Sequence, residues 1–277
     1  MIIKQIIKVF SDCIYKSFAT IIWLLRAVVL TDFRNHIKKG DHKQLSILAN
    51  GPSLSKELES INLDEGDFSV LNFFYKSPVF KQIKPTVYVL ADPYFFTDDH
   101  MMPILESVDW PMSLFVPYRA WRSLNVLKKC PNKHIHVIPY HTGDYAGFEC
   151  IRHWLYKHGL SMPIAQNVLV PSIFNAINMG YKEILLYGVD HSWTETIRVN
   201  SRNEVCQVNT HFYDDKEVEL KPFKKCSGEQ YLMHEILRDF AQMFDSYHYI
   251  RKYADLVGCR IINCTKNSFI DAFERVK

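Results

Sequence analysis

Residues Asn50, Gly51, Pro52 and Ser53 follow a short apolar run and precede a helical pattern, an arrangement that suits the binding of a phosphate group. Gly51 permits a close backbone approach, and Pro52 fits a first helical turn without wasting a donor. Free amides and the dipole at the start of a helix attract an anion. An ordinary strand-to-helix turn capped by Asn or Ser has the same composition. Because these residues follow the first predicted strand, we favour the binding of a nucleotide phosphate.

Polar residues also follow other apolar runs. Asn72 comes after the second run, while Asp92 and Asp190 end the third and sixth, in LADP and GVDH. Each carboxylate could bind a ribose hydroxyl, a sugar hydroxyl or a metal, or could cap backbone amides of a loop. The chain contains no D-x-D, and its adjacent acidic pairs are typical of a solvated surface. We therefore predict no metal site.

The segment 191–227 is polar and much longer than the usual connection of about two to six residues in such folds. This length predicts a lid or an acceptor-binding loop. His211 lies in its middle, in NTHFYDD. A neutral imidazole there could take a proton from an acceptor hydroxyl, because the ordinary histidine pKa is about 6.5. A purely structural role is the alternative for any one of the twelve histidines.

Strand and helix patterns alternate from residue 44 onward and predict an α/β fold with a mostly parallel sheet covered by helices on both faces. The predicted strands are Gln44–Ala49, Phe68–Leu71, Thr86–Ala91, Ser113–Val116, His134–Ile138, Glu183–Tyr187 and Arg260–Asn263. The predicted helices are 97–106, 119–129, 145–158, 168–179 and 229–257. In such a sheet, ligands bind beyond the carboxyl ends of the strands, where the polar residues named above occur.

The sequence predicts that residues 1–43 form a separate arm, which consists of one amphipathic helix and a linker. It predicts a catalytic domain at 44–277. Polar side chains recur every four residues from Lys4 to Thr20, and apolar side chains fill the remaining surface. Only nine residues separate Lys16 from Arg26, against roughly 20 apolar residues needed to cross a bilayer. We expect the helix to lie on an anionic membrane surface. Packing on the catalytic domain or on a partner subunit is the alternative.

Charge and cysteine content narrow the function classes. The 277 residues include 33 Lys or Arg and 30 Asp or Glu, a net charge of +3 that is too small for a dedicated nucleic-acid binder. Residues 1–43 hold eight of these basic residues against three acidic ones, so the positive excess lies in the arm. Seven scattered cysteines without a C-x-x-C pair indicate reduced thiols in the cytoplasm.

Six motifs occur in the order ILANGPSL, VLNFFY, VYVLADP, NMGYKEILLYGVD, NTHFY and INCTKNSF. In this order the chain resembles the bacterial sialyltransferases of glycosyltransferase family 42. It is also similar to the related 6-hydroxymethylpterin pyrophosphokinase-like domains of surface-polysaccharide loci. The resemblance covers about residues 45–275.

The resemblance implies a Rossmann-like, GT-A-like domain with a lid that uses a CMP-activated nonulosonic sugar without metal or other cofactor. Asn50, Gly51 and Ser53 would hold the cytidine monophosphate, Asn72 would contact its phosphate or ribose, and His211 would be the general base. Some positions depart from the sialyltransferase pattern: Asp92 replaces an Asn, residues around Asn167 replace Thr-Ser-Gly, and the tyrosines after G-V-D are absent. Tyr213 is a candidate substitute for those tyrosines.

The resulting prediction is an inverting glycosyltransferase of surface polysaccharide or lipooligosaccharide, peripheral to the cytoplasmic face of the bacterial inner membrane. Its partners would be a CMP-linked sugar donor, a glycan or glycolipid acceptor and the membrane, with no nucleic acid; a homo-oligomer is left open. The predicted donor pocket is formed by Asn50, Gly51, Pro52, Ser53, Asn72, Asp92, Asn167, Gly188, Asp190, His191 and Tyr213. One alternative is an ATP-dependent pyrophosphokinase of a pterin-like alcohol, with Mg²⁺ on Asp92 and Asp190. Another is a non-catalytic, membrane-tethered assembly subunit.

Overall fold

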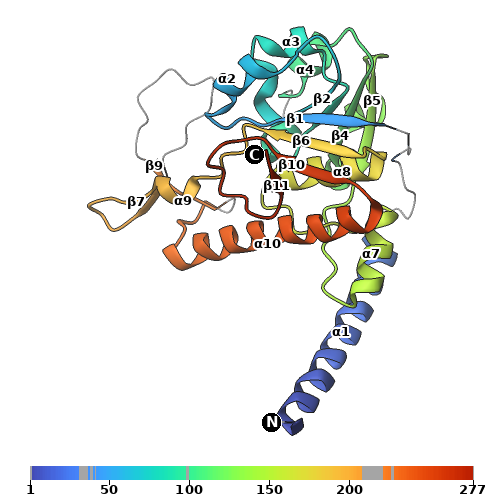
Figure 1. The fold of residues 1–277 in the computed structure, drawn as a ribbon, viewed down its shortest axis with the longest axis vertical. Helices are drawn as coiled ribbons and strands as arrows, with labels where there is room; N and C mark the ends of the chain where they lie inside the picture. The colour runs from blue at the N-terminus through green and yellow to red at the C-terminus, as the bar shows by residue number, and fades with distance from the viewer. Residues whose placement is uncertain are drawn as a thin grey trace.

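A computed structural model describes residues 2–30, 37, 40, 42–97, 100–207, 221–225 and 228–276. It has an α/β body and an N-terminal helix that projects from it (Figure 1). In the described part of the chain, the body contains an eight-stranded sheet in the order β11-β10-β6-β1-β2-β3-β4-β5. The strands are β1 (Gln44–Leu48), β2 (Asp67–Leu71), β3 (Val87–Val89), β4 (Met112–Pro117), β5 (Ile135–Tyr140), β6 (Glu183–Tyr187), β10 (Arg260–Asn263) and β11 (Glu274–Arg275).

Neighbouring strands of this sheet pair in parallel, from the β1 and β2 register of Leu45 with Asp67 to the β4 and β5 register of Met112 with Ile135. The predicted parallel, Rossmann-like sheet is therefore confirmed. The chain builds β1 to β5 outward on one side of β1, then returns to place β6 on the other side. This reversal is a topological switch point, and it opens a crevice beyond the carboxyl ends of β1 and β6.

Helices cover both faces of the sheet, as predicted (Figure 1). Alternate residues of β1 point to opposite faces of the sheet. Leu45 and Ile47 pack in the core beneath the helices at 169–179 and 233–257, whereas Leu48 packs in the core beneath the helices at 54–57, 79–83 and 102–107. The helices are α1 (Ile2–Leu30), α2 (Leu54–Glu57), α3 (Val79–Ile83), α4 (Met102–Ser107), α5 (Tyr118–Ser123), α6 (Asn125–Lys128), α7 (Glu149–Lys157), α8 (Leu169–Met179), α9 (Trp193–Thr196) and α10 (Met233–Val257). Short 3-10 turns are η1 (Leu58–Ser60), η2 (Asn72–Lys76) and η3 (Pro93–Phe96).

The segment 191–227 has more regular structure than the sequence predicts. Its described part holds α9 and a small antiparallel sheet of β7 (Ile197–Val199), β8 (Val205–Gln207) and β9 (Lys221–Pro222). Asn200 makes the turn between β7 and β8, because its Oδ1 accepts hydrogen bonds from the amides of Arg202 and Glu204. Three-residue strands are too short for alternation to reveal them.

The predicted N-terminal helix is confirmed as α1, a helix of 29 residues. Its C-terminal half contacts the body through Tyr145: the Thr20 hydroxyl lies 2.6 Å from the Tyr145 hydroxyl, and Trp23 meets the Tyr145 ring edge-on. Ala27 is buried. Among the described residues, no helix has both the length and the apolar character that crossing a membrane requires.

Candidate functional site at the topological switch point

A cavity of about 310 Å³ lies where β1 and β6 separate, within the size range of small-ligand sites. Its walls are the residues after β1, β2, β3 and β6, together with the start of α8. The predicted residues that line it are Asn50, Gly51, Pro52, Asn72, Asp92, Asn167, Gly188, Asp190 and His191. The polar residues at the strand ends are thus brought together. Predicted residues His211 and Tyr213 lie outside the described residues.

Gly51 is the point at which the loop after β1 presses on the loop after β6. Its amide donates to the carbonyl of Gly188 at 2.9 Å. A Cβ at this position would lie 2.0 Å from Asp190 Oδ2 and 2.4 Å from that carbonyl oxygen. The approach excludes any side chain, so glycine is required here by contact.

Two further hydrogen bonds tie these loops together. The Ser53 hydroxyl donates to Asp190 Oδ2 at 2.8 Å, so it points at the neighbouring loop, and Ser53 does not line the cavity. The amide of Gly188 donates to Glu57 Oε2 at 2.7 Å. Helix α2 begins at Leu54, after Pro52, and has only four residues. The predicted contribution of a helix dipole is therefore small, and the cavity wall depends on side chains and loops instead.

Asn72 and Asp92 join the ends of β2 and β3. Asn72 has a positive φ of 40°, and its Oδ1 accepts hydrogen bonds from the amides of Ala91 and Asp92 at 3.0 and 3.3 Å. Asp92 Oδ1 accepts from the Tyr94 amide at 2.9 Å and caps η3. The capping role considered for Asp92 is confirmed. One oxygen of its carboxylate is thereby occupied, while the residue still faces the cavity.

The buried His191 and Tyr247, the latter from α10, form a polar cluster with the partly buried Asn167. His191 Nε2 lies 2.6 Å from the Tyr247 hydroxyl, and Asn167 Nδ2 donates to the same hydroxyl at 2.9 Å. Asn167 Oδ1 accepts from the amides of Leu169 and Val170 at the start of α8. Burial lowers the pKa of His191 to about 3, so its ring is neutral at physiological pH. A neutral ring can orient a ligand without adding charge.

Asn50 offers a hydrogen-bonding group that the described residues do not satisfy. Its Nδ2 donates to the carbonyl of Leu71 at 3.1 Å, whereas its buried Oδ1 has no partner. Buried polar atoms are normally hydrogen-bonded, so this oxygen suits a hydroxyl or amino group of a ligand. None of the described residues that line the cavity is Lys or Arg. An anionic group would therefore be held by hydrogen-bond donors.

Sequence reasoning missed two supports of this site, Glu57 and Tyr247. Glu57 comes one turn after the Asn50–Ser53 segment, and its partner Gly188 is 131 residues away. Tyr247 belongs to the apolar stripe of α10, which predicts a core position but says nothing of its hydroxyl. Trp193, which lines the cavity and stacks on Phe240, comes two residues after the G-V-D-H motif ends.

A family model matches more than half of the chain. The family model described as "6-hydroxymethylpterin diphosphokinase MptE-like" matches residues 18–196. The matched region runs from the half of α1 that contacts the body to Thr196, and it includes every described residue that lines the cavity. A search of curated proteins found no match to the chain. The similarity to glycosyltransferase family 42 stays a prediction, and the chain belongs to the 6-hydroxymethylpterin diphosphokinase MptE-like family.

Proposed function

We propose that the switch-point cavity binds a nucleotide and that the protein is a transferase using a nucleotide-activated substrate. The carrying observation is the convergence of Asn50, Asn72, Asp92 and Asp190 from four strand ends on one cavity. Ligands of doubly wound sheets bind at this place. The unpartnered Asn50 oxygen and the amide of Asn72 supply the uncharged hydrogen-bonding groups that a ribose or a pyrimidine base requires.

The activated substrate that we favour is a CMP-linked sugar, on the strength of the six ordered motifs. In the proposed reaction, His211 takes the proton of an acceptor hydroxyl while the acceptor oxygen bonds to the anomeric carbon of the sugar. The bond from that carbon to the phosphate oxygen breaks in the same displacement, which inverts the configuration. The leaving CMP carries away the electron pair, and neutral donors stabilise its phosphate. This route requires no metal.

The small sheet beside the cavity supports His211 as the base. Thr196 lines the cavity, and the next residue, Ile197, pairs with Gln207 at the end of β8. Only three residues lie between Gln207 and His211 in the sequence, so the backbone can span at most about 14 Å from one to the other. A span of this length is compatible with the proposed role of His211 at the cavity.

A pyrophosphokinase acting on a pterin-like alcohol is the second candidate, favoured by the family's description and by two carboxylates in one cavity. Asp92 and Asp190 each have one oxygen in a hydrogen bond and one left over. Mg²⁺ commonly takes one or two protein carboxylates together with substrate phosphates, so this pair fits that ion. Mg²⁺ there would neutralise phosphate charge. A non-catalytic role receives less support, because side chains do not fill the cavity.

We also propose that the protein acts at the cytoplasmic face of the inner membrane, on a glycan or glycolipid acceptor. The exposed apolar side chains of α1 support this location. So does the excess of basic residues in 1–43.

The deciding experiment measures the melting temperature of the full chain with CMP, UDP, GDP or ATP, in EDTA and in Mg²⁺. A ligand that binds the native state must stabilise it, by about 2.7 kcal/mol at a hundred times its Kd. We expect CMP to raise the melting temperature in EDTA. If only ATP stabilises the chain, and only when Mg²⁺ is present, the pyrophosphokinase becomes the favoured function in place of the glycosyltransferase.

A further inference from the structure

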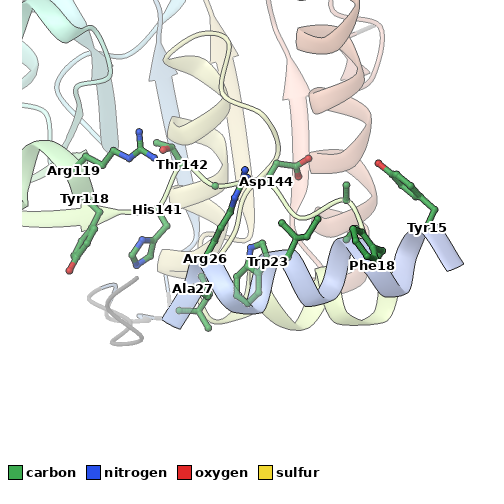
Figure 2. A pocket seen from close by; sticks show the side chains of 15 residues that line it. Tyr15, Phe18, Trp23, Arg26, Ala27, Tyr118, Arg119, His141, Thr142 and Asp144 are labelled. Carbon is green, nitrogen blue, oxygen red and sulfur yellow. The ribbon is translucent and has the colours of Figure 1, made fainter. Parts of the chain in front are cut away.

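A second cavity, of about 570 Å³, lies between α1 and the carboxyl ends of β4 and β5 (Figure 2). Residues of α1, among them Phe18, Ile22 and Trp23, form its apolar wall. The segments after β4 and β5 form the opposite wall with Arg119 and Thr142. One wall is thus a projecting helix and the other is the body, so the cavity exists only because α1 docks there.

Two arginines, Arg26 and Arg119, bring unpaired positive charge to this cavity. Figure 2 shows them reaching from α1 and from α5 toward Thr142 and Asp144. Neither guanidinium makes a hydrogen bond or an ion pair with any residue in the part of the chain that the structure describes. The nearby Asp144 carboxylate interacts electrostatically with Arg152, which lies outside the lining. Positive charge therefore exceeds negative charge on the cavity wall.

The cavity opens beside the exposed apolar side of α1. Phe18 and Ile22 line it and are still 65% and 40% exposed. They continue into a row of exposed side chains along the helix: Ile7, Phe10, Ile14, Ile21 and Leu25. The residues that anchor α1 to the body, Thr20, Trp23 and Ala27, lie on a roughly opposite side of the helix. The apolar row thus points away from the body and is left uncovered by it.

We propose that this cavity binds the phosphate headgroup of an anionic membrane phospholipid. Arg26 and Arg119 hold the phosphate, because guanidinium groups bind phosphate through paired hydrogen bonds. The acyl chains pass over Phe18 and Ile22 into the bilayer, where the apolar row of α1 is also buried. Charge complementarity selects this occupant: residues 1–43 hold eight basic and three acidic residues, and the inner leaflet is anionic. The proposal deepens the proposed membrane location and is independent of the nucleotide.

The test uses flotation of the full chain with vesicles of phosphatidylcholine alone or vesicles enriched in phosphatidylglycerol. The variant Arg26→Gln/Arg119→Gln removes both cavity charges. Its matched control, Lys8→Gln/Arg122→Gln, removes one exposed charge from each of the same two helices, away from the cavity. We expect the cavity variant to bind anionic vesicles at least about tenfold more weakly than the control variant, because it loses the charge-assisted hydrogen bonds to the phosphate.

A second measurement separates the sources of phosphate. Short-chain phosphatidylglycerol below its micelle concentration should bind the wild-type chain saturably and shift the fluorescence of Trp23, with Trp23→Phe identifying that signal. Inorganic phosphate should give no comparable shift. This measurement on the wild-type chain keeps the proposal testable if a charge variant folds poorly.

Three results would overturn the proposal. Equal loss of vesicle binding in both double variants would reduce the effect to general surface charge. If inorganic phosphate bound as tightly as short-chain phosphatidylglycerol, the cavity would be a phosphate site and not a lipid site. A stable dimer that protects α1 and ignores vesicles would make a second copy of the chain the occupant of the apolar row. Nucleotide stabilisation is measured at the other cavity, so its failure remains distinguishable.

Discussion

The two cavities at the carboxyl edge of the sheet are built in different ways. At the switch point, side chains bond one loop to another: Ser53 to Asp190, Glu57 to Gly188 and Asn72 to the end of β3. Beside α1, Arg26 and Arg119 have no such partner among the described residues, and Phe18 is exposed. The first cavity is preorganised by its own hydrogen bonds, whereas we propose that a membrane surface completes the second.

Because of this difference, substitutions at the two cavities should affect different properties of the protein. Changes at the switch point should alter nucleotide affinity and turnover, because the loops there hold one another in place. Changes beside α1 should alter attachment to the membrane and leave nucleotide affinity intact.

His211→Ala should lower turnover by about 10²–10⁴-fold, the usual contribution of a general base. Nucleotide affinity should change little, because the base acts on the acceptor. Transfer assays with a CMP-sugar, combined with calorimetry for CMP, measure the two effects. Undiminished turnover would remove His211 from the mechanism, and joint loss of affinity would make it a binding residue.

Gly51→Ala should break the preorganised cavity, because its Cβ would lie 2.0 Å from Asp190 Oδ2. Overpacking of this kind typically costs about 1–3 kcal/mol, and we expect a matching loss of CMP affinity. Gly143→Ala is the control: a Cβ there meets nothing within 4 Å, although Gly143 lines the cavity beside α1. If both variants bind CMP like the wild type, the close approach at Gly51 has no functional role.

Acid should destabilise the switch-point cluster through His191. The unfolded histidine has a pKa of about 6.5, whereas burial lowers the native value to about 3. Below about pH 6.5 the histidine is protonated in the unfolded state but stays neutral in the native state. The free energy of unfolding therefore falls by up to about 1.4 kcal/mol per pH unit, down to about pH 3. Urea unfolding of the wild type and His191→Gln over this window measures the effect. An equal slope in both proteins would contradict it.

Tyr145→Phe should loosen the anchor of α1 and have the smallest effect. The hydroxyl of Tyr145 lies 2.6 Å from the Thr20 hydroxyl and accepts from the Phe148 amide at 3.1 Å. Its removal should cost about 1 kcal/mol and speed proteolysis within α1. Thr20→Val tests the same bond from its other partner, and the double variant should show coupling between the two. Additive effects would mean that the bond does not anchor the helix.

Most of the sheet could be predicted from the sequence. Glu183–Tyr187 and Arg260–Asn263 are predicted with the observed bounds, because strands buried in a parallel sheet appear as compact apolar runs. One rule predicts the cavity residues: polar residues that follow parallel strands lie at the same edge of the sheet. Asn50, Asn72, Asp92 and Asp190 obey that rule.

The remaining features depend on contacts between residues far apart in the chain. Glu57 reaches Gly188, and Tyr247 reaches His191, through packing that no local pattern encodes. The hydrogen bond from Ser53 to Asp190 also depends on such a distant contact. A serine at this position suits a phosphate-binding loop, but in the fold its hydroxyl points at Asp190. No pattern in the sequence predicts the cavity beside α1, because that cavity depends on where the helix docks.

Calorimetric titration of CMP into the wild type and Gly51→Ala, in EDTA, tests the central claim most directly. Saturable binding to the wild type, weakened in Gly51→Ala and kept in Gly143→Ala, is the result that a nucleotide cavity at the switch point predicts. No heat with CMP in the wild type, together with ATP binding that appears only when Mg²⁺ is added, would contradict it.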